Sequence, residues 1–507
     1  ASDSLGRMWA VVFGSLLALT PFLLRRELGR VAMLAACAYL AISPTVLVAS
    51  RRVDGTVIAA AGAMLLLGGA VRWVGSRRSR WLTLAAVGLA LALTSGESAY
   101  GLLLPLGLAT LFFARLLGDG RVHDWMGDAE ILRPDQRHFL LVFAGSFVAL
   151  STGLGWNLAG LGATGNHLAG WLGKFRQSAT LSPSPLLLMS LYEPLGLVFG
   201  VGAVLLGIVG RREEPLTIGL WAAVAALLLA VMPGRIPTDL IWLVVPISLL
   251  AGIGVEAVAG GRWGRRGWLW LAYGALVIVL WGHGYLMLAH YAAVGEPADL
   301  ALAIIAVVVQ APLGISFGVL LGMKRVGRVA AVGAGLVLLG ATLGAGWGVA
   351  YRRGVDPREP LVLSPTALNV RDLVGTIEDL SWQETGIPTT LSFTYEAAPN
   401  SVVAWYLRDF GEAERVDRLE SIRGDELGSV LVSRGRDEAI LGSAEGSYAG
   451  QDFALSRRWA PGALDCRFWQ AGSNVAVRWF LFREGIPLPE ADEWVTLWRA
   501  VGDSHSK

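Results

Sequence analysis

The sequence has few charged residues for its length. Only 16% of its 507 residues are Asp, Glu, Lys or Arg, whereas a soluble domain usually has about 25%. The shortage is confined to the first two thirds of the chain, where apolar runs of roughly 17–24 residues follow one another and the charged residues cluster between them. This pattern excludes an ordinary soluble protein and is typical of a polytopic membrane protein.

Lysine and cysteine are also scarce. Lys174, Lys324 and Lys507 are the only lysines, which we attribute to genome composition. The net charge of +2 comes from arginines spread over many loops, so no basic patch indicates nucleic-acid binding. Cys37 lies in an apolar run and Cys466 in the polar tail, which argues against a disulfide between them and fits no zinc-site spacing.

No cleavable signal peptide is visible at the start of the sequence. The chain begins at Ala1 without a methionine, on a short polar stretch that leads directly into an apolar run. We therefore expect an N-terminus that is processed or incomplete.

The apolar runs predict about twelve transmembrane helices, since a helix of about 20 residues crosses a bilayer. Residues 1–353 would form this transmembrane domain, and residues 354–507 a separate domain. The predicted spans are 8–24, 31–50, 56–74, 81–95, 99–117, 138–155, 186–209, 216–232, 240–259, 268–288, 298–321 and 328–350.

The basic loops predict the orientation of these spans. Cytoplasmic loops are enriched in Lys and Arg. When the end of the first span is placed in the cytoplasm, every strongly basic short loop lies on that side; these loops lie near residues 25–30, 77–80, 118–137, 211–212, 262–266 and 324–328. We therefore predict a plasma-membrane protein whose tail after residue 351 is extracytoplasmic.

Three arginines break this rule. Arg51, Arg52 and Arg235 lie in loops predicted to be external. One interpretation is an anion site, such as a site for a lipid phosphate, at the outer membrane face. The other is that each side chain extends along the interface to a local carboxylate. The sequence leaves both interpretations open.

The tail has short alternating apolar patterns. Val370–Leu380 and Val402–Phe410 are predicted helices, and Thr390–Thr394, Ser429–Ser433 and Val475–Arg483 are predicted strands. Strands that alternate with helices predict a small soluble α/β domain. The tail contains no Gly-rich phosphate loop, metal-ligand cluster or hydrolase elbow in its sequence, so no chemistry is assigned to it.

Ionisable residues at the outer ends of the spans are candidates for a site. Together they would line an externally open cavity with both signs of charge, which suits a phosphate-bearing lipid headgroup and a general base. The cavity candidates are Glu97, His167, Tyr192, Glu193 and Asp239, and the phosphate-binding candidates are Arg51, Arg52, Asp54 and Arg235.

Short motifs that match one known family occur along the chain. They are Leu23–Gly29, Ala41–Pro44, Arg51–Asp54, Tyr192–Leu195, Gly234–Pro237, Val245–Gly252, Asn369–Val374 and Ala404–Asp409. Together they resemble the GT-C glycosyltransferases, polytopic enzymes that take sugars from polyprenyl-phosphate donors. The resemblance is closer to a prokaryotic subgroup described as flippase activity-associated, glycosyltransferase 39-like membrane proteins, which are related to the protein O-mannosyltransferases.

The resemblance implies an inverting sugar transfer. In this family a carboxylate on the first external loop deprotonates the acceptor, and basic residues hold the lipid phosphate. Arg52, Asp54 and Arg235 match positions where such families place polar donor-site or structural residues. The chain starts just after the expected catalytic loop, where Asp3 is the only acidic residue, so no catalytic residue is predicted.

Two further features depart from the family. Gly96 precedes Glu97 where relatives often have lysine, and the two spans at 298–350 are more than close relatives would have. The loss of polar groups would fit a degenerate transferase.

Three functional hypotheses follow. The first is a membrane glycosyltransferase that uses a polyprenyl-phosphate sugar, with membrane lipids and that donor as its partners. The second is a non-catalytic GT-C relative that serves as an accessory or structural subunit of a larger membrane complex, with protein partners. The third, a transporter or lipid flippase, is disfavoured because the sequence shows no inverted repeat and no charged residue near a span centre. No metal-ligand cluster is predicted, and the sequence leaves open whether a divalent metal takes part.

Overall fold

The computed structural model describes residues 3–116, 134–177, 182–260, 267–362, 369–398, 401–419, 429–435, 447–457, 472–484 and 491–501. The chain forms two compact units. The first contains Ala1–Arg353 and Leu464–Gly485, and the second contains Gly354–Ala463 and Ile486–Lys507. The sequence-based division at residue 353 did not include the return of 464–485 to the first unit. Cys466 and most of the 118–137 loop lie outside the described residues.

The first unit is helical. Its described elements are α1 (Asp3–Leu19), η1 (Thr20–Leu24), α2 (Arg25–Leu28), α3 (Arg30–Ile42), α4 (Pro44–Ala49), α5 (Thr56–Ser76), α6 (Ser79–Thr94), α7 (Ser98–Leu116), α9 (Pro134–Ser151), α10 (Gly160–Gly173), η2 (Lys174–Arg176), α11 (Pro185–Tyr192), α12 (Pro194–Gly210), α13 (Glu213–Val231), η3 (Pro237–Leu240), α14 (Ile241–Ala259), α15 (Gly267–Val294), α16 (Pro297–Val308), α17 (Gln310–Leu321), α18 (Met323–Trp347), the π-helical turn η4 (Gly348–Arg352) and α22 (Ser473–Phe482).

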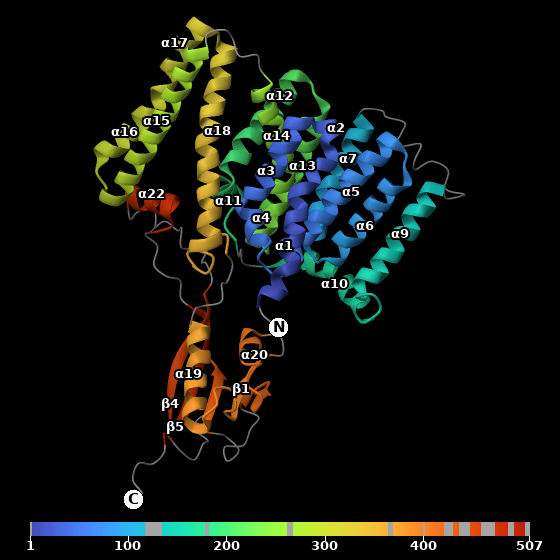
Figure 1. Ribbon diagram of the computed structural model, residues 1–507, viewed down its shortest axis with the longest axis vertical. Coiled ribbons are helices and arrows are strands. Elements are labelled where there is room, and N and C mark those ends of the chain that lie inside the picture. Colours follow the sequence, from blue (N-terminus) through green and yellow to red (C-terminus); the bar gives the residue numbers. More distant parts are fainter. Residues whose placement is uncertain are drawn as a thin grey trace, which may run out of the picture. The chain divides into compact units, whose positions relative to one another are not determined.

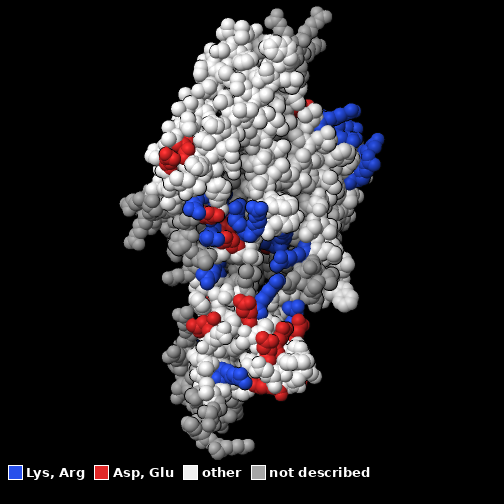
Figure 2. Space-filling model, turned by 60° about the vertical axis from the view of Figure 1, so that its left-hand side comes forward, with Lys and Arg blue, Asp and Glu red and all other residues white. Residues whose placement is uncertain are grey.

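The polytopic helical architecture predicted from the sequence is confirmed. Among the described residues, seven helical segments are long and apolar enough to cross a membrane, or eight if the bent pair α11–α12 is one span. Arg30–Ile42, Ser79–Thr94 and Ser98–Phe112 are apolar but shorter. The described helices therefore support many spans without reaching the count of about twelve. Figure 2 shows a broad face with few charged side chains, as a lipid-facing surface requires.

Two of the predicted spans are broken rather than continuous. The segment 31–50 breaks at Ser43, between α3 and α4, and the segment 186–209 breaks at Glu193, where α11 and α12 are bent by 108°. The helix after each break starts with a proline, Pro44 or Pro194. Proline fits the first turn of a helix, but it disfavours helical geometry in the residue before it. The breaks are therefore encoded locally, although the apolar runs conceal them.

Helices of the first unit pack in layers (Figure 1). α5, α6 and α9 lie side by side, α14 packs between α3, α12 and α13, and α15 packs against α16, α18 and α22. α14 is the central helix. Of the apolar stretch of the η3–α14 segment, 72% is buried, whereas only 11% of the apolar stretch of the α16–α17 segment is buried. The periphery formed by α15 to α17 is thus largely available to lipid.

The second unit contains a five-stranded mixed sheet. Its order is β2-β1-β3-β5-β4, with β1 parallel to β2 and β3, and β5 antiparallel to β3 and β4. The elements are α19 (Asn369–Thr385), β1 (Phe393–Glu396), α20 (Val402–Tyr406), β2 (Ala413–Val416), β3 (Val430–Arg434), β4 (Ser447–Arg457) and β5 (Ala491–Val501). This arrangement agrees with the α/β architecture predicted for the tail.

The core of the second unit follows the predicted helical face. Val370, Leu373, Ile377 and Leu380 of α19 are all buried in one cluster with the inner side chains of the sheet. Their spacing of three or four residues places them on one side of the helix. The amphipathic pattern read from the sequence is therefore confirmed.

The strand predicted at Val475–Arg483 is wrong. The segment forms the helix α22, which packs against α15, and it belongs to the first unit. Its valine, tryptophan and phenylalanine residues favour strands locally. Here packing overrides that preference, because Trp479 is buried and Ser473 Oγ lies 2.5 Å from Tyr291 Oη of α15.

The close packing of α5 against α6 gives a test of this fold. A Cβ atom added at Gly62 would lie 2.7 Å from the backbone nitrogen of Ala92 and 2.7 Å from the carbonyl oxygen of Gly88. Gly62→Ala should therefore separate the two helices and reduce the free energy of unfolding by about 1–3 kcal/mol. The measurement is thermal unfolding in detergent. Gly75→Ala, on the same helix with nothing within 4 Å of the new atom, is the control and should not destabilise the protein.

Candidate functional site

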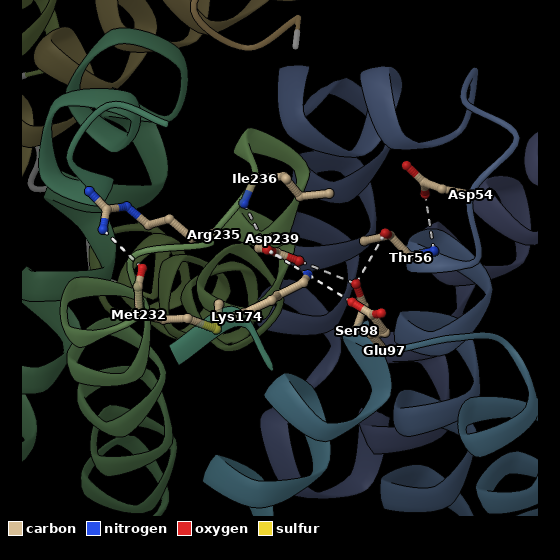
Figure 3. Close-up of polar contacts among 9 residues, drawn as sticks. All are labelled: Asp54, Thr56, Glu97, Ser98, Lys174, Met232, Arg235, Ile236 and Asp239. Atoms are coloured by element: carbon tan, nitrogen blue, oxygen red, sulfur yellow. Dashed lines mark hydrogen bonds and ion pairs between the residues drawn. The ribbon is translucent and has the colours of Figure 1, made fainter. Parts of the chain in front are cut away.

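The predicted residues Glu97 and Asp239 lie in one polar cluster at one end of the first unit, together with Thr56, Ser98 and Lys174, which were not predicted. The cluster lies where α5, α7 and η3 begin (Figure 3). Thr56 Oγ1 lies 3.2 Å from Ser98 Oγ, and Ser98 Oγ donates to Asp239 Oδ1 over 3.3 Å. Short polar side chains at three helix starts are therefore joined into one hydrogen-bonded chain.

Asp239 and Lys174 form the charged centre of this cluster. Asp239 is fully buried, and its Oδ2 lies 3.2 Å from Lys174 Nζ and accepts a hydrogen bond of 2.9 Å from the backbone N–H of Ile236. Lys174 is nearly buried as well, and its ammonium lies 6.0 Å from the centre of the Trp242 ring. A buried carboxylate requires such a partner, because an unpaired charge in an apolar interior is very unfavourable.

Glu97 is the more accessible carboxylate of the cluster. Its Oε2 lies 3.6 Å from Lys174 Nζ, and its side chain is 39% exposed, whereas that of Asp239 is 0% exposed. Lys174 thus bridges one buried and one accessible carboxylate. A ligand that enters from solvent would meet Glu97 and the ammonium of Lys174 before Asp239.

Arg52 and Asp54 pair with each other. Arg52 Nε lies 3.0 Å from Asp54 Oδ2, and Asp54 Oδ1 accepts a hydrogen bond of 3.1 Å from the backbone N–H of Thr56. Asp54 therefore satisfies a free N–H at the start of α5. For Arg52 the geometry matches the interpretation of a local carboxylate partner.

Arg51 contacts a different part of the unit. Its guanidinium donates to the carbonyl of Ala350 and lies 4.9 Å from the centre of the Tyr351 ring, both in the π-helical turn η4. The sequence neighbours Arg51 and Arg52 thus have different partners. Their predicted role in phosphate binding stays a prediction.

Arg235 holds the backbone before α11. Its guanidinium donates to the carbonyl oxygens of Met232, Ser182 and Pro183 over 3.1, 3.3 and 3.5 Å. Burial lowers the pKa of Arg235 from its usual value, and an arginine nevertheless stays protonated at neutral pH. Within the described part of the chain no carboxylate pairs with it. Three of its five N–H groups are used, so two remain for an anion.

An apolar cavity of about 520 Å³ begins beside the residues that Arg235 holds. Its wall starts at Ser184 and Pro185, directly after Pro183, and continues along α11, α12, α13 and α14. Ser184 is the only polar residue among the described residues that line it. The cavity therefore suits a hydrocarbon chain.

The remaining candidates have structural partners. Glu193, at the break between α11 and α12, is fully buried and accepts hydrogen bonds from Tyr39 Oη (2.5 Å), Ser43 Oγ (2.5 Å) and the backbone N–H of Thr45 (3.1 Å). Tyr192 is also fully buried. His167 Nδ1 lies 3.5 Å from the carbonyl oxygen of Leu93. The sequence did not predict the contacts of any of these three residues.

Sequence analysis missed Lys174, Ser98 and Thr56 as site residues. Serine and threonine at helix starts give no distinctive signal. Lys174 does give a distinctive signal, because it is one of only three lysines and lies in a long loop between apolar runs. In the described part of the chain, no three His, Cys, Asp or Glu side chains gather as ligands of a metal ion.

The Lys174–Asp239 pair can be tested directly. Lys174→Met leaves the buried carboxylate of Asp239 without its cation and should destabilise the first unit by about 3–5 kcal/mol. Thermal unfolding in detergent measures the loss. The double variant Lys174→Met/Asp239→Asn should recover part of it, and Arg176→Met, an exposed residue two positions away, should leave stability unchanged. Equal melting temperatures for all four proteins would contradict the pairing.

Comparisons with known proteins give a structural likeness but no sequence match. No protein-family profile and no curated protein matches the sequence. The structure is similar to ArnT from Cupriavidus metallidurans bound to undecaprenyl phosphate, with a TM-score of 0.51, 15% identity, and coverage of 90% of this chain and 82% of that one. The apo state of the same protein gives a TM-score of 0.50, 15% identity, and coverage of 89% and 82%.

A weaker likeness extends to an archaeal enzyme. AglB, the oligosaccharyltransferase from Archaeoglobus fulgidus in complex with an inhibitory peptide and a dolichol-phosphate, gives a TM-score of 0.38 with 12% identity, over 99% of this chain and 77% of that one. The likeness that carries weight is therefore the one to ArnT, and at this identity it concerns the fold. The chain therefore shares the fold of ArnT.

Proposed function

We propose that this protein is a membrane glycosyltransferase that takes a sugar from a polyprenyl-phosphate donor at the extracytoplasmic face. The observation that carries the proposal is the apolar cavity beside Arg235. A polyprenyl phosphate needs an apolar channel for its hydrocarbon and a cation for its phosphate at the channel mouth. The fold shared with ArnT, a protein whose structure holds undecaprenyl phosphate, supports the same ligand class.

In this proposal Arg235 binds the donor phosphate with the two N–H groups left free by its backbone contacts. The carbonyls of Met232, Ser182 and Pro183 hold the guanidinium in place. An arginine fixed in this way can bind a phosphate without losing much side-chain entropy on binding.

The cluster of Glu97, Lys174 and Asp239 would receive the polar end of the substrates. Asp239 holds Lys174, and Lys174 together with the accessible Glu97 presents both signs of charge. Such a pair can hydrogen-bond sugar hydroxyls as donor and as acceptor. Arg51, Arg52 and Asp54 are proposed to support this end of the unit.

The proposal includes twelve membrane segments. The short apolar helices α3, α6 and α7 and the helix α9 would then cross or enter the bilayer with the longer ones. The tail, except α22, would form an extracytoplasmic domain. The accessory-subunit hypothesis is not favoured, because the polar cluster can bind sugar hydroxyls and the apolar cavity suits a hydrocarbon chain, as a donor-binding site requires.

The role of Arg235 gives the central test of the function. In reconstituted membranes supplied with a polyprenyl-phosphate sugar, Arg235→Ala should lower transfer about a hundredfold at limiting donor, as expected when a cation that stabilises a phosphate is lost. Arg235→Lys keeps the charge but not the forked donors, so it should retain part of the activity.

Arg176→Ala is the matched control, since Arg176 is an exposed arginine at the end of η2 that is not assigned to the site. Thermal unfolding of each variant shows whether the fold is intact. Unchanged turnover in a folded Arg235→Ala protein would refute the assigned role, and absence of turnover in the wild type with every polyprenyl donor tried would refute the function.

The orientation is tested by labelling single cysteines with a membrane-impermeant maleimide. In a background without Cys37 and Cys466, Glu412→Cys in the tail should be labelled in intact cells. Arg325→Cys, in the first turn of α18 at an end predicted to be cytoplasmic, should react only after permeabilisation. Both positions are exposed within their own units. The opposite pattern would invert the topology.

A further inference from the structure

The helix that forms one wall of the apolar cavity is held by arginines at both ends. α11 begins beside Ser182 and Pro183, whose carbonyls bind Arg235. At its other end, the ring of Tyr192 lies 5.3 Å from the guanidinium carbon of Arg483. Arg483 follows α22, the helix that returns from the tail to the first unit.

Arg483 is fixed by its own helix as well as by Tyr192. Its residue is only 4% exposed and has a left-handed backbone conformation with φ of 61°. Its backbone N–H and its Nη1 both donate to the carbonyl of Trp479, over 2.8 and 3.1 Å. The guanidinium carbon also lies 5.5 Å from the Trp479 ring. A desolvated cation between two aromatic rings forms a strong and directional contact.

α22 itself is anchored at both ends. At its start Ser473 contacts Tyr291 of α15, and at its end Arg353 Nη1 donates to the carbonyl of Phe482 over 3.4 Å. Cations at the carboxyl end of a helix are favourable, because the last carbonyls carry partial negative charge. The helix therefore connects the peripheral α15 to the end of α11.

The position of Tyr192 makes this contact relevant to the cavity. Tyr192 is the last residue of α11, directly before the 108° bend at Glu193. Met189, one turn earlier, and Leu197, just after the bend, both line the cavity. Any change in the bend would alter the separation of these two walls.

We propose that Arg483 is a positioning residue for the lipid donor, and that α22 acts as a clasp that fixes the bend between α11 and α12. The proposal rests on the function proposed above, because it assigns the cavity to the hydrocarbon of the donor. It places part of the C-terminal sequence in the donor-binding unit.

The test compares two arginines of the same segment. Arg483→Ala should weaken binding of a photoreactive polyprenyl phosphate about tenfold and raise KM for the donor with kcat nearly retained. Arg478→Ala is the control, because Arg478 is 47% exposed and pairs with Glu484 at 3.0 Å. Arg483→Lys should recover part of the affinity, because an ammonium also binds aromatic faces. Equal donor affinity in the Arg483→Ala and Arg478→Ala proteins would overturn the proposal.

A cross-link tests whether the clasp stays closed when the donor binds. A Cβ atom added at Gly295 lies 3.9 Å from the Cβ of Asn474, a separation that suits a disulfide. In Gly295→Cys/Asn474→Cys, the oxidised protein should bind the probe as well as the same protein after reduction. Loss of binding on oxidation would contradict the clasp.

Hydrogen exchange separates this inference from the proposed function. Arg483→Ala should speed exchange of the backbone amides of 186–193 relative to Arg478→Ala, with no lipid present. If the wild type bound no polyprenyl phosphate, the function would fail, and the exchange data would still decide whether Arg483 fixes α11. Equal exchange in both variants would overturn the clasp independently of any ligand.

Discussion

The arrangement of the first unit depends on one buried carboxylate. Glu193 lies where α11 ends and α12 begins, and it binds the hydroxyls of Tyr39 and Ser43 and a backbone N–H of Thr45. A break in a helix exposes polar groups that an apolar environment cannot satisfy. Here the second broken segment, between α3 and α4, supplies the donors that the first one needs. The two breaks therefore stabilise each other, and the walls of the apolar cavity take their direction from them.

The same requirement explains the arginines around the cavity. Arg235 satisfies carbonyls in the loop before α11, and Arg483 satisfies carbonyls at the end of α22. Guanidinium groups suit this task, because each carries several donors in a rigid plane and also packs against aromatic rings. Structural and ligand-binding roles are thus compatible in one residue. A guanidinium already fixed by carbonyls is a better phosphate ligand than a mobile one.

Much of the fold was predictable because it follows from periodicity. The apolar runs predicted the helical architecture, and Val370, Leu373 and Ile377 predicted the buried face of α19. The apolar run 186–209 concealed the bend at Glu193, because the mean hydropathy of a long run is hardly changed by a single proline. The helix α22 was missed because its valines and aromatic residues favour strands, while its helical state depends on packing against α15. Tertiary contacts of this kind leave no local pattern.

The candidate site was predictable in composition but not in pairing. Glu97 and Asp239 were identified, yet the residue that joins them, Lys174, was not. The three arginines predicted to be external looked alike in the sequence because each broke the same charge rule. The structure separates them: Arg52 pairs with Asp54, Arg51 contacts η4, and Arg235 contacts only backbone carbonyls among its described partners. An arginine that breaks the rule of basic cytoplasmic loops therefore needs either an anion or a neutral hydrogen-bond acceptor. Only the surrounding structure shows which of the two it has. By that criterion Arg51 and Arg235 both lack a carboxylate partner among the described residues, and Arg235 is the one of the two that lies beside the apolar cavity.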